Sequence, residues 1–219
     1  MRRIIVVGCQ GSGKTSLSRN LGQKLALPVV HLDVLYWRPG WKPSDKPNFR
    51  ARVTEAIAGD AWVVDGSFSG LAFDLTLARA DTLVVIDRPR WLCQWRILLR
   101  SAFDRDKARP DLPEGCPEQF DWKLMREAWR YDTERAPVIE AERMQYGADV
   151  PVVRLRRDRD IQGFLDLAAR HMMDGGDVRR DDQDFFCAMR AANAFIRSVS
   201  AASPFASSAR WSNQRAKPS

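Results

Sequence analysis

Histidine and cysteine are scarce in this chain of 219 residues. The two histidines, His31 and His171, lie far apart, and the four cysteines include no Cys-x-x-Cys pair. This pattern does not fit a disulfide scaffold or a cluster of cysteine and histidine metal ligands. Isolated cysteines are typical of proteins in a reducing compartment, so we expect the protein to be cytoplasmic.

Long hydrophobic runs are also missing. The longest, Ile4–Val7 and Leu83–Ile86, have the length of a strand, whereas a helix needs ~20 apolar residues to span a bilayer. Gly8 interrupts the first run too early for the core of a signal peptide. We therefore expect neither a membrane-spanning segment nor an export signal.

The composition is that of a soluble globular chain with a core of its own, since 45% of the residues are hydrophobic and 29% are charged. Lys and Arg together number 35 against 28 Asp and Glu, which gives a net charge of +7. Most of the basic residues are Arg, whose planar guanidinium suits phosphate contacts. The excess favours anionic partners, phosphates or nucleic acid, although an Arg-rich coding bias would produce it too.

Strand-like apolar runs alternate with segments of helical spacing, which predicts an α/β fold with a five-stranded parallel sheet flanked by helices. We expect the strands at Ile4–Val7, Val29–Leu32, Trp62–Asp65, Thr82–Asp87 and Val150–Leu155.

Three helices can be placed from the spacing of their apolar residues. The first begins near Lys14, the second is capped by Ser44 or Asp45, and the third has Pro89 in its first turn. Their apolar residues are Leu17, Leu21 and Leu25 in the first, Phe49, Val53 and Ile57 in the second, and Leu92, Trp95, Leu98 and Leu99 in the third.

Two stretches interrupt the alternation. Residues 104–119 are rich in proline, glycine and charge, and their length favours a mobile functional lid between two helices. From residue 174 to 219 the sequence becomes rich in Ser and Ala, and we expect much of this tail to be disordered. The predicted organisation is one domain over 1–173 followed by the tail.

One motif carries chemistry. Gly8-Cys9-Gln10-Gly11-Ser12-Gly13-Lys14-Thr15 matches GxxxxGK[ST] between a predicted strand and a predicted helix, which is the context of a P-loop NTPase. Its glycines let backbone N–H groups surround a phosphate, Lys14 reaches the β- and γ-phosphates, and the Thr15 hydroxyl ligates Mg²⁺. We expect ATP and Mg²⁺ as cofactors, bound by Gly8, Gly11, Ser12, Gly13, Lys14, Thr15 and Ser16.

A P-loop also needs an acid for Mg²⁺ at the end of a neighbouring strand. Asp65 and Asp87 both close apolar strands, and we favour Asp65 because Gly66 after it permits close approach of a ligand. No Asn-Lys-x-Asp run is present, so the guanine-specificity element of GTPases is missing. This favours a kinase over a switch protein.

The combined motifs resemble the nucleoside monophosphate kinases, adenylate kinase above all. More closely, His31-Leu32-Asp33-Val34-Leu35-Tyr36-Trp37, Trp62-Val63-Val64-Asp65-Gly66 and the run from Arg109-Pro110-Asp111 to Glu118 resemble the adenylate-kinase-like DNA topology modulation (FlaR-type) proteins. The resemblance covers about residues 1–172. It implies the P-loop kinase fold more firmly than a substrate.

The resemblance also implies roles for arginines. Arg96 would pack on the ATP adenine and Arg100, one helical turn further, would meet phosphate. Lid arginines closing over the transferring phosphoryl group would be Arg109 and, as further candidates, Arg126 and Arg130. The loop on the adenine side would run from Arg156 to Asp160.

On the acceptor side the sequence departs from adenylate kinase, because only a short helix with Arg50 and Arg52 follows the second strand. Asp33 stands where shikimate kinases and related small-molecule kinases place an acid near the acceptor hydroxyl, and it can orient that hydroxyl or accept its proton. Clustered aromatic residues could stack on a base or belong to the core. These are Tyr36, Trp37 and Trp41.

The sequence thus predicts an ATP- and Mg²⁺-dependent phosphotransferase, acting as monomer or homodimer on a small acceptor. The acceptor is either a nucleoside monophosphate or a hydroxyl compound. The alternative is a nucleotide-regulated nucleic-acid-binding protein that modulates DNA topology, although the sequence holds no helix-turn-helix, zinc or RNP signature.

Overall fold

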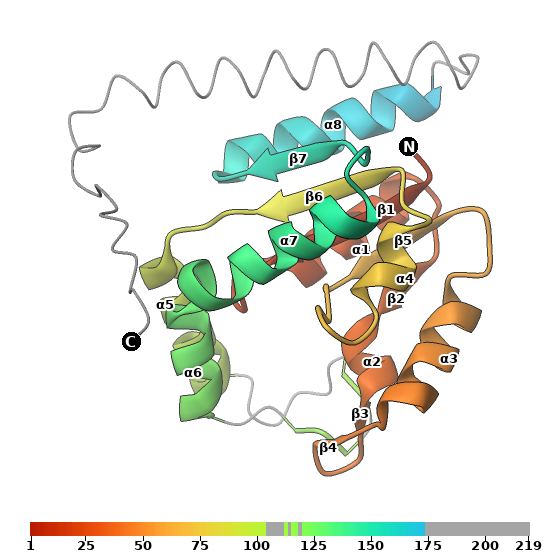
Figure 1. Ribbon diagram of the computed structural model, residues 1–219. Coiled ribbons are helices and arrows are strands. Elements are labelled where there is room, and N and C mark those ends of the chain that lie inside the picture. The colour runs from red at the N-terminus through yellow and green to blue at the C-terminus, as the bar shows by residue number, and fades with distance from the viewer. Residues whose placement is uncertain (104–111, 114, 118–119, 174–219) are drawn as a thin grey trace, which may run out of the picture.

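Five parallel strands form a single sheet, in the order β2-β5-β1-β6-β7. The computed structural model describes residues 1–103, 112–113, 115–117 and 120–173, and the predicted tail and most of the predicted lid lie outside them (Figure 1). The strands are β1 (Arg3–Gly8), β2 (Val29–His31), β5 (Trp62–Asp65), β6 (Thr82–Ile86) and β7 (Val152–Leu155). The α/β prediction with a five-stranded parallel sheet is confirmed.

Strand β1 lies at the centre of the sheet, where its apolar side chains are fully buried. Its neighbours are β5, with Val6 opposite Asp65, and β6, with Gly8 opposite Ile86. The carboxyl ends of the three strands therefore meet at one edge of the sheet, which is where α/β proteins bind ligands.

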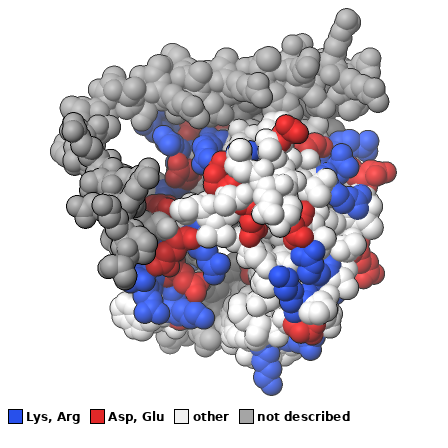
Figure 2. Space-filling model, viewed as in Figure 1, with Lys and Arg blue, Asp and Glu red and all other residues white. Residues whose placement is uncertain are grey.

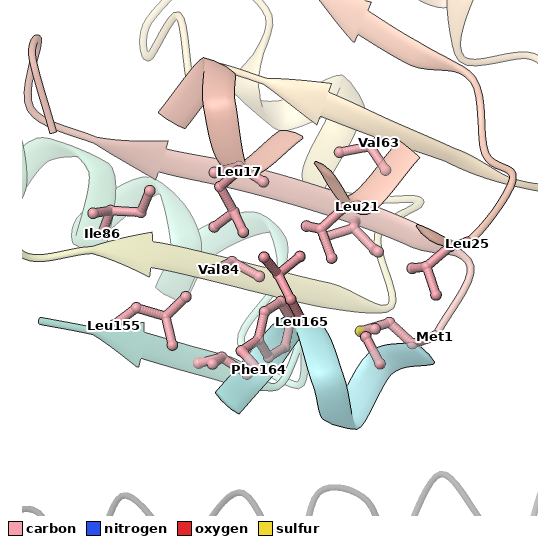
Figure 3. Packing of buried hydrophobic residues seen from close by; sticks show 14 residues of the cluster. Met1, Leu17, Leu21, Leu25, Val63, Val84, Ile86, Leu155, Phe164 and Leu165 are labelled. Carbon is pink, nitrogen blue, oxygen red and sulfur yellow. The ribbon is translucent and has the colours of Figure 1, made fainter. Parts of the chain in front are cut away.

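Helices cover both faces of the sheet (Figure 1). On one face, α1 (Lys14–Lys24) and α8 (Asp158–Met173) contribute Leu17, Leu21, Phe164 and Leu165 to a cluster that packs on the strands (Figure 3). The other face is covered by α3 (Lys46–Ala56), α4 (Phe73–Leu77) and α7 (Ala136–Tyr146). The predicted leucine stripe of α1 and the Asp45 cap of α3 are both present, the latter through a 2.9 Å hydrogen bond from Asn48 N.

The segment after β2 is more elaborate than the sequence indicated. The predicted strand ends one residue early, and Leu32 begins the short helix α2 (Leu32–Tyr36). A two-stranded hairpin, β3 (Trp37–Arg38) and β4 (Lys42–Pro43), then leads to α3. The hairpin and α2 thus connect the edge strand β2 to α3.

The apolar stripe predicted for the third helix was wrong about which face is buried. Helix α5 (Arg90–Phe103) buries Cys93, Ile97 and Ser101, whereas Trp95 is 56% exposed. The predicted Leu98 and Leu99 are exposed as well. The physical reason is that the face of α5 with Cys93 and Ile97 packs against the P-loop at Gly11, where a Cβ would meet both residues.

Beyond the lid segment, α6 (Trp122–Trp129) packs beside α5 and continues through a π-helical turn, η1 (Tyr131–Arg135), into α7. Among the described residues, no helix is long and apolar enough to cross a membrane.

Truncating the core beneath α1 tests this packing. Leu21→Ala removes a side chain that is 0% exposed, and we expect it to lower the free energy of unfolding by ~3 kcal/mol because a cavity remains. The control Leu98→Ala, at a position 39% exposed, should cost less than ~1 kcal/mol. Urea denaturation of both variants measures the difference, and equal losses would contradict the assignment of the core.

Candidate functional site

The P-loop lies between β1, which ends at Gly8, and α1, which begins at Lys14. Gly11 and Gly13 have φ angles of 77° and 101°, in the left-handed region that favours glycine. A Cβ on Gly8 would lie 2.6 Å from the carbonyl oxygen of Ile86, and one on Gly11 would lie 2.5 Å from that of Cys93. Only glycine fits at these two positions, of which Gly8 is the first glycine of the GxxxxGK[ST] pattern and Gly11 is an additional glycine within it.

Two donors of the P-loop share one acceptor. Ser12 N and Lys14 Nζ both donate hydrogen bonds to the carbonyl oxygen of Cys9, at 3.1 Å and 2.9 Å. The Ser12 hydroxyl is buried and has no hydrogen-bond partner among the described residues. Thr15 and Ser16 lie in the first turn of α1, whose N-terminal N–H groups and dipole attract anions.

Asp65 is buried at the end of β5, one strand away from the P-loop strand. Its Oδ2 lies 2.9 Å from Nδ1 of His31, which closes β2. The backbone N–H of Gly66 donates to the carbonyl oxygen of Val6 at 3.0 Å, which holds this turn against β1. The carboxylate is thereby fixed at the same edge of the sheet as Lys14.

Helix α5 brings one of the two predicted arginines to the P-loop. Arg96 Nη1 donates to the carbonyl oxygen of Ser12 at 3.3 Å. Arg100 lies one turn further along α5 and is half-buried. The hydrogen bond to Ser12 therefore places Arg96 against the P-loop.

Two of the three predicted lid arginines, Arg126 and Arg130, lie in the described part of the chain. Arg109 lies outside it. Arg126 is exposed on α6, and Arg130, at the end of that helix, pairs with Glu134 at 3.1 Å. Their predicted catalytic roles stay predictions.

Residues 115–117, near the end of the predicted lid, contact the β3–β4 hairpin. Gly40 N donates to the carbonyl oxygen of Gly115 at 2.8 Å, and Trp41 Nε1 donates to that of Pro117 at 3.1 Å. The Cys116 thiol reaches the carbonyl oxygen of Arg38 at 3.2 Å. The β3–β4 hairpin and residues 115–117 therefore form one unit.

The loop after β7 lies at the opposite edge of the sheet from β2. Arg156 pairs with Asp87 at 3.0 Å, and the buried Arg88 pairs with Asp158. A hollow of about 430 Å³ opens beside these two pairs. It is lined by Asp87, Arg88, Pro89, Arg90, Asp132, Arg156 and Arg157.

Asp33 lies in the first turn of α2 with an exposed side chain, two residues beyond His31. The aromatic residues near it divide between two environments. Tyr36 packs with Phe49 and Phe68 at centroid distances of 5.0 Å and 4.9 Å within the core cluster. Trp37 and Trp41 contact each other edge to face on the hairpin, with 5.6 Å between ring centroids.

Both arginines of α3 are engaged within the protein. Arg50 makes two hydrogen bonds to Asp74, of 2.7 Å and 2.8 Å, and this ion pair lowers the pKa of the Asp74 carboxyl. Arg52 Nη1 donates to the carbonyl oxygen of Leu35 at 2.6 Å. Neither side chain is arranged to receive a phosphate group.

The residues present fit Mg²⁺ with phosphates better than a cation held by protein alone. In the described part of the chain, no three His, Cys, Asp or Glu side chains gather to hold a metal ion. Mg²⁺ usually takes one or two carboxylates and completes its shell with water and substrate phosphate. Thr15 and Asp65 would provide that kind of partial shell, and the Ser12 hydroxyl, which has no hydrogen-bond partner among the described residues, lies in the P-loop.

Charges of both signs are interspersed over the described residues of the face drawn in Figure 2. Basic and acidic side chains alternate there without forming a continuous field of one sign. A nucleic-acid footprint would gather Lys and Arg on one face or stripe. This face gives the nucleic-acid alternative no support.

Two partnerships in the site were not predicted from the sequence. No role was predicted for His31, and its pairing with Asp65 depends on β2 and β5 being adjacent. Cys9 and Cys93 lie in one buried cluster, which depends on the position of α5. A clue to the first was that both residues end strands.

No protein-family model matches the sequence, and no curated protein sequence does either. Among solved structures, a gluconokinase from Sinorhizobium meliloti is similar with a TM-score of 0.45 and 15% identity, covering 90% of this chain and 97% of its own. A shikimate kinase from Acinetobacter baumannii, in complex with shikimate, has a TM-score of 0.48 and 14% identity over 80% and 94%. The shikimate kinase from Aquifex aeolicus has 0.41 and 13% over 80% and 99%. At such low identity their substrates do not transfer to this chain.

The contact between the P-loop and α5 can be tested at Gly11. Gly11→Ala should lower the free energy of unfolding by ~2 kcal/mol or more, because a Cβ strains the positive φ and collides with the Cys93 backbone. Gly59→Ala is the matched control, since a Cβ there meets nothing within 4 Å. Thermal unfolding measures both, and equal stability of the two variants would refute the close packing.

Proposed function

We propose that the protein is an ATP-dependent phosphotransferase whose acceptor is a small hydroxyl compound. The observation that carries the proposal is the P-loop, which has no room for a Cβ at Gly8 or Gly11, with Lys14 at its end and two carboxylates nearby in the fold. Asp65 is the last residue of β5, and Asp33 lies in α2 just beyond β2, so both belong to the edge of the sheet that the P-loop occupies. A phosphate donor and an acceptor can meet there.

The donor side is supported by the contacts of α5 and by the loop after β7. Arg96 lies on the P-loop, and the hollow beside Arg156 and Arg157 borders the loop that the family resemblance links to adenine. The volume of the hollow falls within the usual range for small-molecule sites. ATP bound in this orientation would extend from the hollow to the P-loop.

The acceptor side favours a hydroxyl over a phosphate. A nucleoside monophosphate needs cations for its phosphate, yet Arg50 is held by Asp74 and Arg52 by the backbone of Leu35. Breaking a bidentate ion pair to bind substrate would cost binding free energy. Asp33 has an exposed side chain and carries the carboxylate that an alcohol acceptor requires.

In the transfer, Asp33 orients the acceptor hydroxyl and accepts its proton as the oxygen attacks the γ-phosphorus. Lys14 and the P-loop N–H groups stabilise the charge that develops on the phosphoryl oxygens. Mg²⁺, held by Thr15 and Asp65, would neutralise the β- and γ-phosphates. His31 holds the Asp65 carboxylate in place.

A coupled assay of ATP consumption tests the proposal directly. Purified protein is offered nucleoside monophosphates, nucleosides, sugars and small hydroxy acids with Mg²⁺. Turnover with a hydroxyl compound supports the proposal, and turnover confined to monophosphates would assign the protein to the nucleoside monophosphate kinases. Membership of the DNA topology modulation family, suggested by the resemblance, stays a prediction.

Lys14→Ala should lower phosphotransfer by ~10³-fold or more, because the lysine neutralises charge that grows in the transition state. The side chain contacts the loop and not the core, so the variant should fold normally. Lys24→Ala, at the other end of α1 where Lys24 pairs with Asp166, is the control and should keep its activity. Wild-type turnover in folded Lys14→Ala protein would refute the kinase assignment.

Asp33→Asn distinguishes the two acceptor chemistries. With a hydroxyl acceptor, kcat should fall by ~10²- to 10⁴-fold while ATP affinity stays near normal, because the proton acceptor is lost. With an acceptor that is already ionised, the acceptor KM should rise at nearly constant kcat. Asp60→Asn, at an exposed position before β5, controls for the loss of a surface charge in the same steady-state assay.

A further inference from the structure

Helix α5 carries large apolar side chains on the side that faces away from its buried residues. The buried side chains are spaced four residues apart and are Cys93, Ile97 and Ser101. A second apolar series has the same spacing but is displaced by two residues, which on a helix is a rotation of ~200°. We call it, with Leu98 beside it, the outer stripe of α5. Its residues are Trp91, Trp95, Leu98, Leu99 and Phe103.

The outer stripe is exposed from one end of the helix to the other. Trp91, in the first turn, is 66% exposed, and Phe103, the last residue, is 73% exposed. Trp95 and the two leucines between them are exposed as well. Single apolar residues on a surface are ordinary, but a continuous stripe with three large aromatic rings marks an interaction surface.

Helix α6 extends this surface. It lies beside α5 (Figure 1), and Gln94 Nε2 on α5 donates to the carbonyl oxygen of Met125 on α6 at 2.6 Å. At the end of α6, Trp129 is 53% exposed, and the guanidinium carbon of Arg90 lies 5.4 Å from its ring centroid. Because Arg90 directly precedes Trp91, Trp129 continues the apolar surface from the beginning of the stripe onto α6.

The exposed area is close to one side of a protein–protein interface. The outer stripe and Trp129 together expose on the order of 700 Å² of side chain, on a scale of about 150–250 Å² for a whole aromatic side chain. The largest apolar patch on a typical monomer measures about 300–600 Å², and a standard interface buries about 800 Å² on each partner. The surface is thus larger than a monomer usually leaves open.

The charges around the stripe favour a second copy of this chain as the partner. Helix α5 contains three arginines and no acidic residue, and no arginine belongs to the stripe. Arg90 pairs with Asp132 at 3.2 Å, and Arg96 donates to the carbonyl oxygen of Ser12. A helix that binds an anionic membrane or an acidic partner uses its basic residues for that contact, whereas these two are engaged within the protein. An uncharged stripe can meet its own copy without like-charge repulsion.

We propose that the outer stripe of α5, together with Trp129, is the interface of a homodimer, in which α5 packs against α5 of a second copy. Two-fold symmetry is the commonest arrangement of soluble oligomers, and it joins the same surface of both chains. With the axis through the middle of the stripe, Leu98 lies close to its own counterpart whether the two helices run parallel or antiparallel. The dimer does not depend on the proposed kinase activity.

The mass of the protein in solution tests the interface. By size-exclusion chromatography with light scattering, wild-type protein should have the mass of two chains and dissociate on dilution. Trp95→Glu should raise the dissociation constant of the dimer by ~30-fold or more, because it places a charge in an apolar contact. Met144→Glu is the matched control, since Met144 is 58% exposed but belongs to α7, and it should stay dimeric. Wild-type protein with the mass of one chain, or equal weakening by both variants, would overturn the proposal.

A cross-link locates the contact independently, even if Trp95→Glu protein does not fold. Leu98→Cys should be joined to its counterpart by a short bis-maleimide, which gives a species of two chains under denaturing conditions. Asp60→Cys, at an exposed position before β5, is the control and should give far less of it. Both variants also carry Cys187→Ser, which removes a cysteine outside the described residues. A dimer that Leu98→Cys does not cross-link, or that both variants cross-link equally, would show that the outer stripe is not the interface. Neither measurement uses ATP, so a failure of the proposed function leaves both decisive.

Discussion

The close contact of the P-loop backbone with β6 and α5 determines how the rest of the site is arranged. The loop is pressed between the end of β6 and the backbone of α5, with no room for a Cβ at Gly8 or Gly11. Backbone N–H groups can line a phosphate site only if side chains stay out of the way. Every other candidate residue is positioned relative to this loop.

The strand order determines where the two carboxylates beside the P-loop lie. Because β1 lies between β5 and β6, Asp65 and Asp87 end up on opposite sides of the P-loop strand. Each is then paired by the next strand in the sheet, Asp65 with His31 at the end of β2 and Asp87 with Arg156 after β7. The site is therefore built from strand ends, which are rigid, with the variable segments placed around them.

Helices α5 and α3 each show that a residue's neighbours decide what it can do. Helix α5 buries Cys93, Ile97 and Ser101 and leaves Trp95 exposed, which reverses the usual preference for burying aromatics. On α3, Arg50 forms an ion pair with Asp74. Both cases show that residue type alone does not tell which groups a site can use.

The sequence by itself determined the α/β fold, the parallel sheet and the P-loop, because these depend on local periodicity and on a motif whose spacing reflects backbone sterics. It also singled out Asp65, since strand ends can be read along the chain, and the family resemblance added Arg96. Only the tertiary structure decided that His31 faces Asp65, that Cys9 and Cys93 share one buried cluster and that α5 buries Cys93, Ile97 and Ser101. Those contacts join residues far apart in sequence, and their geometry depends on strand order and helix position, which no local pattern encodes.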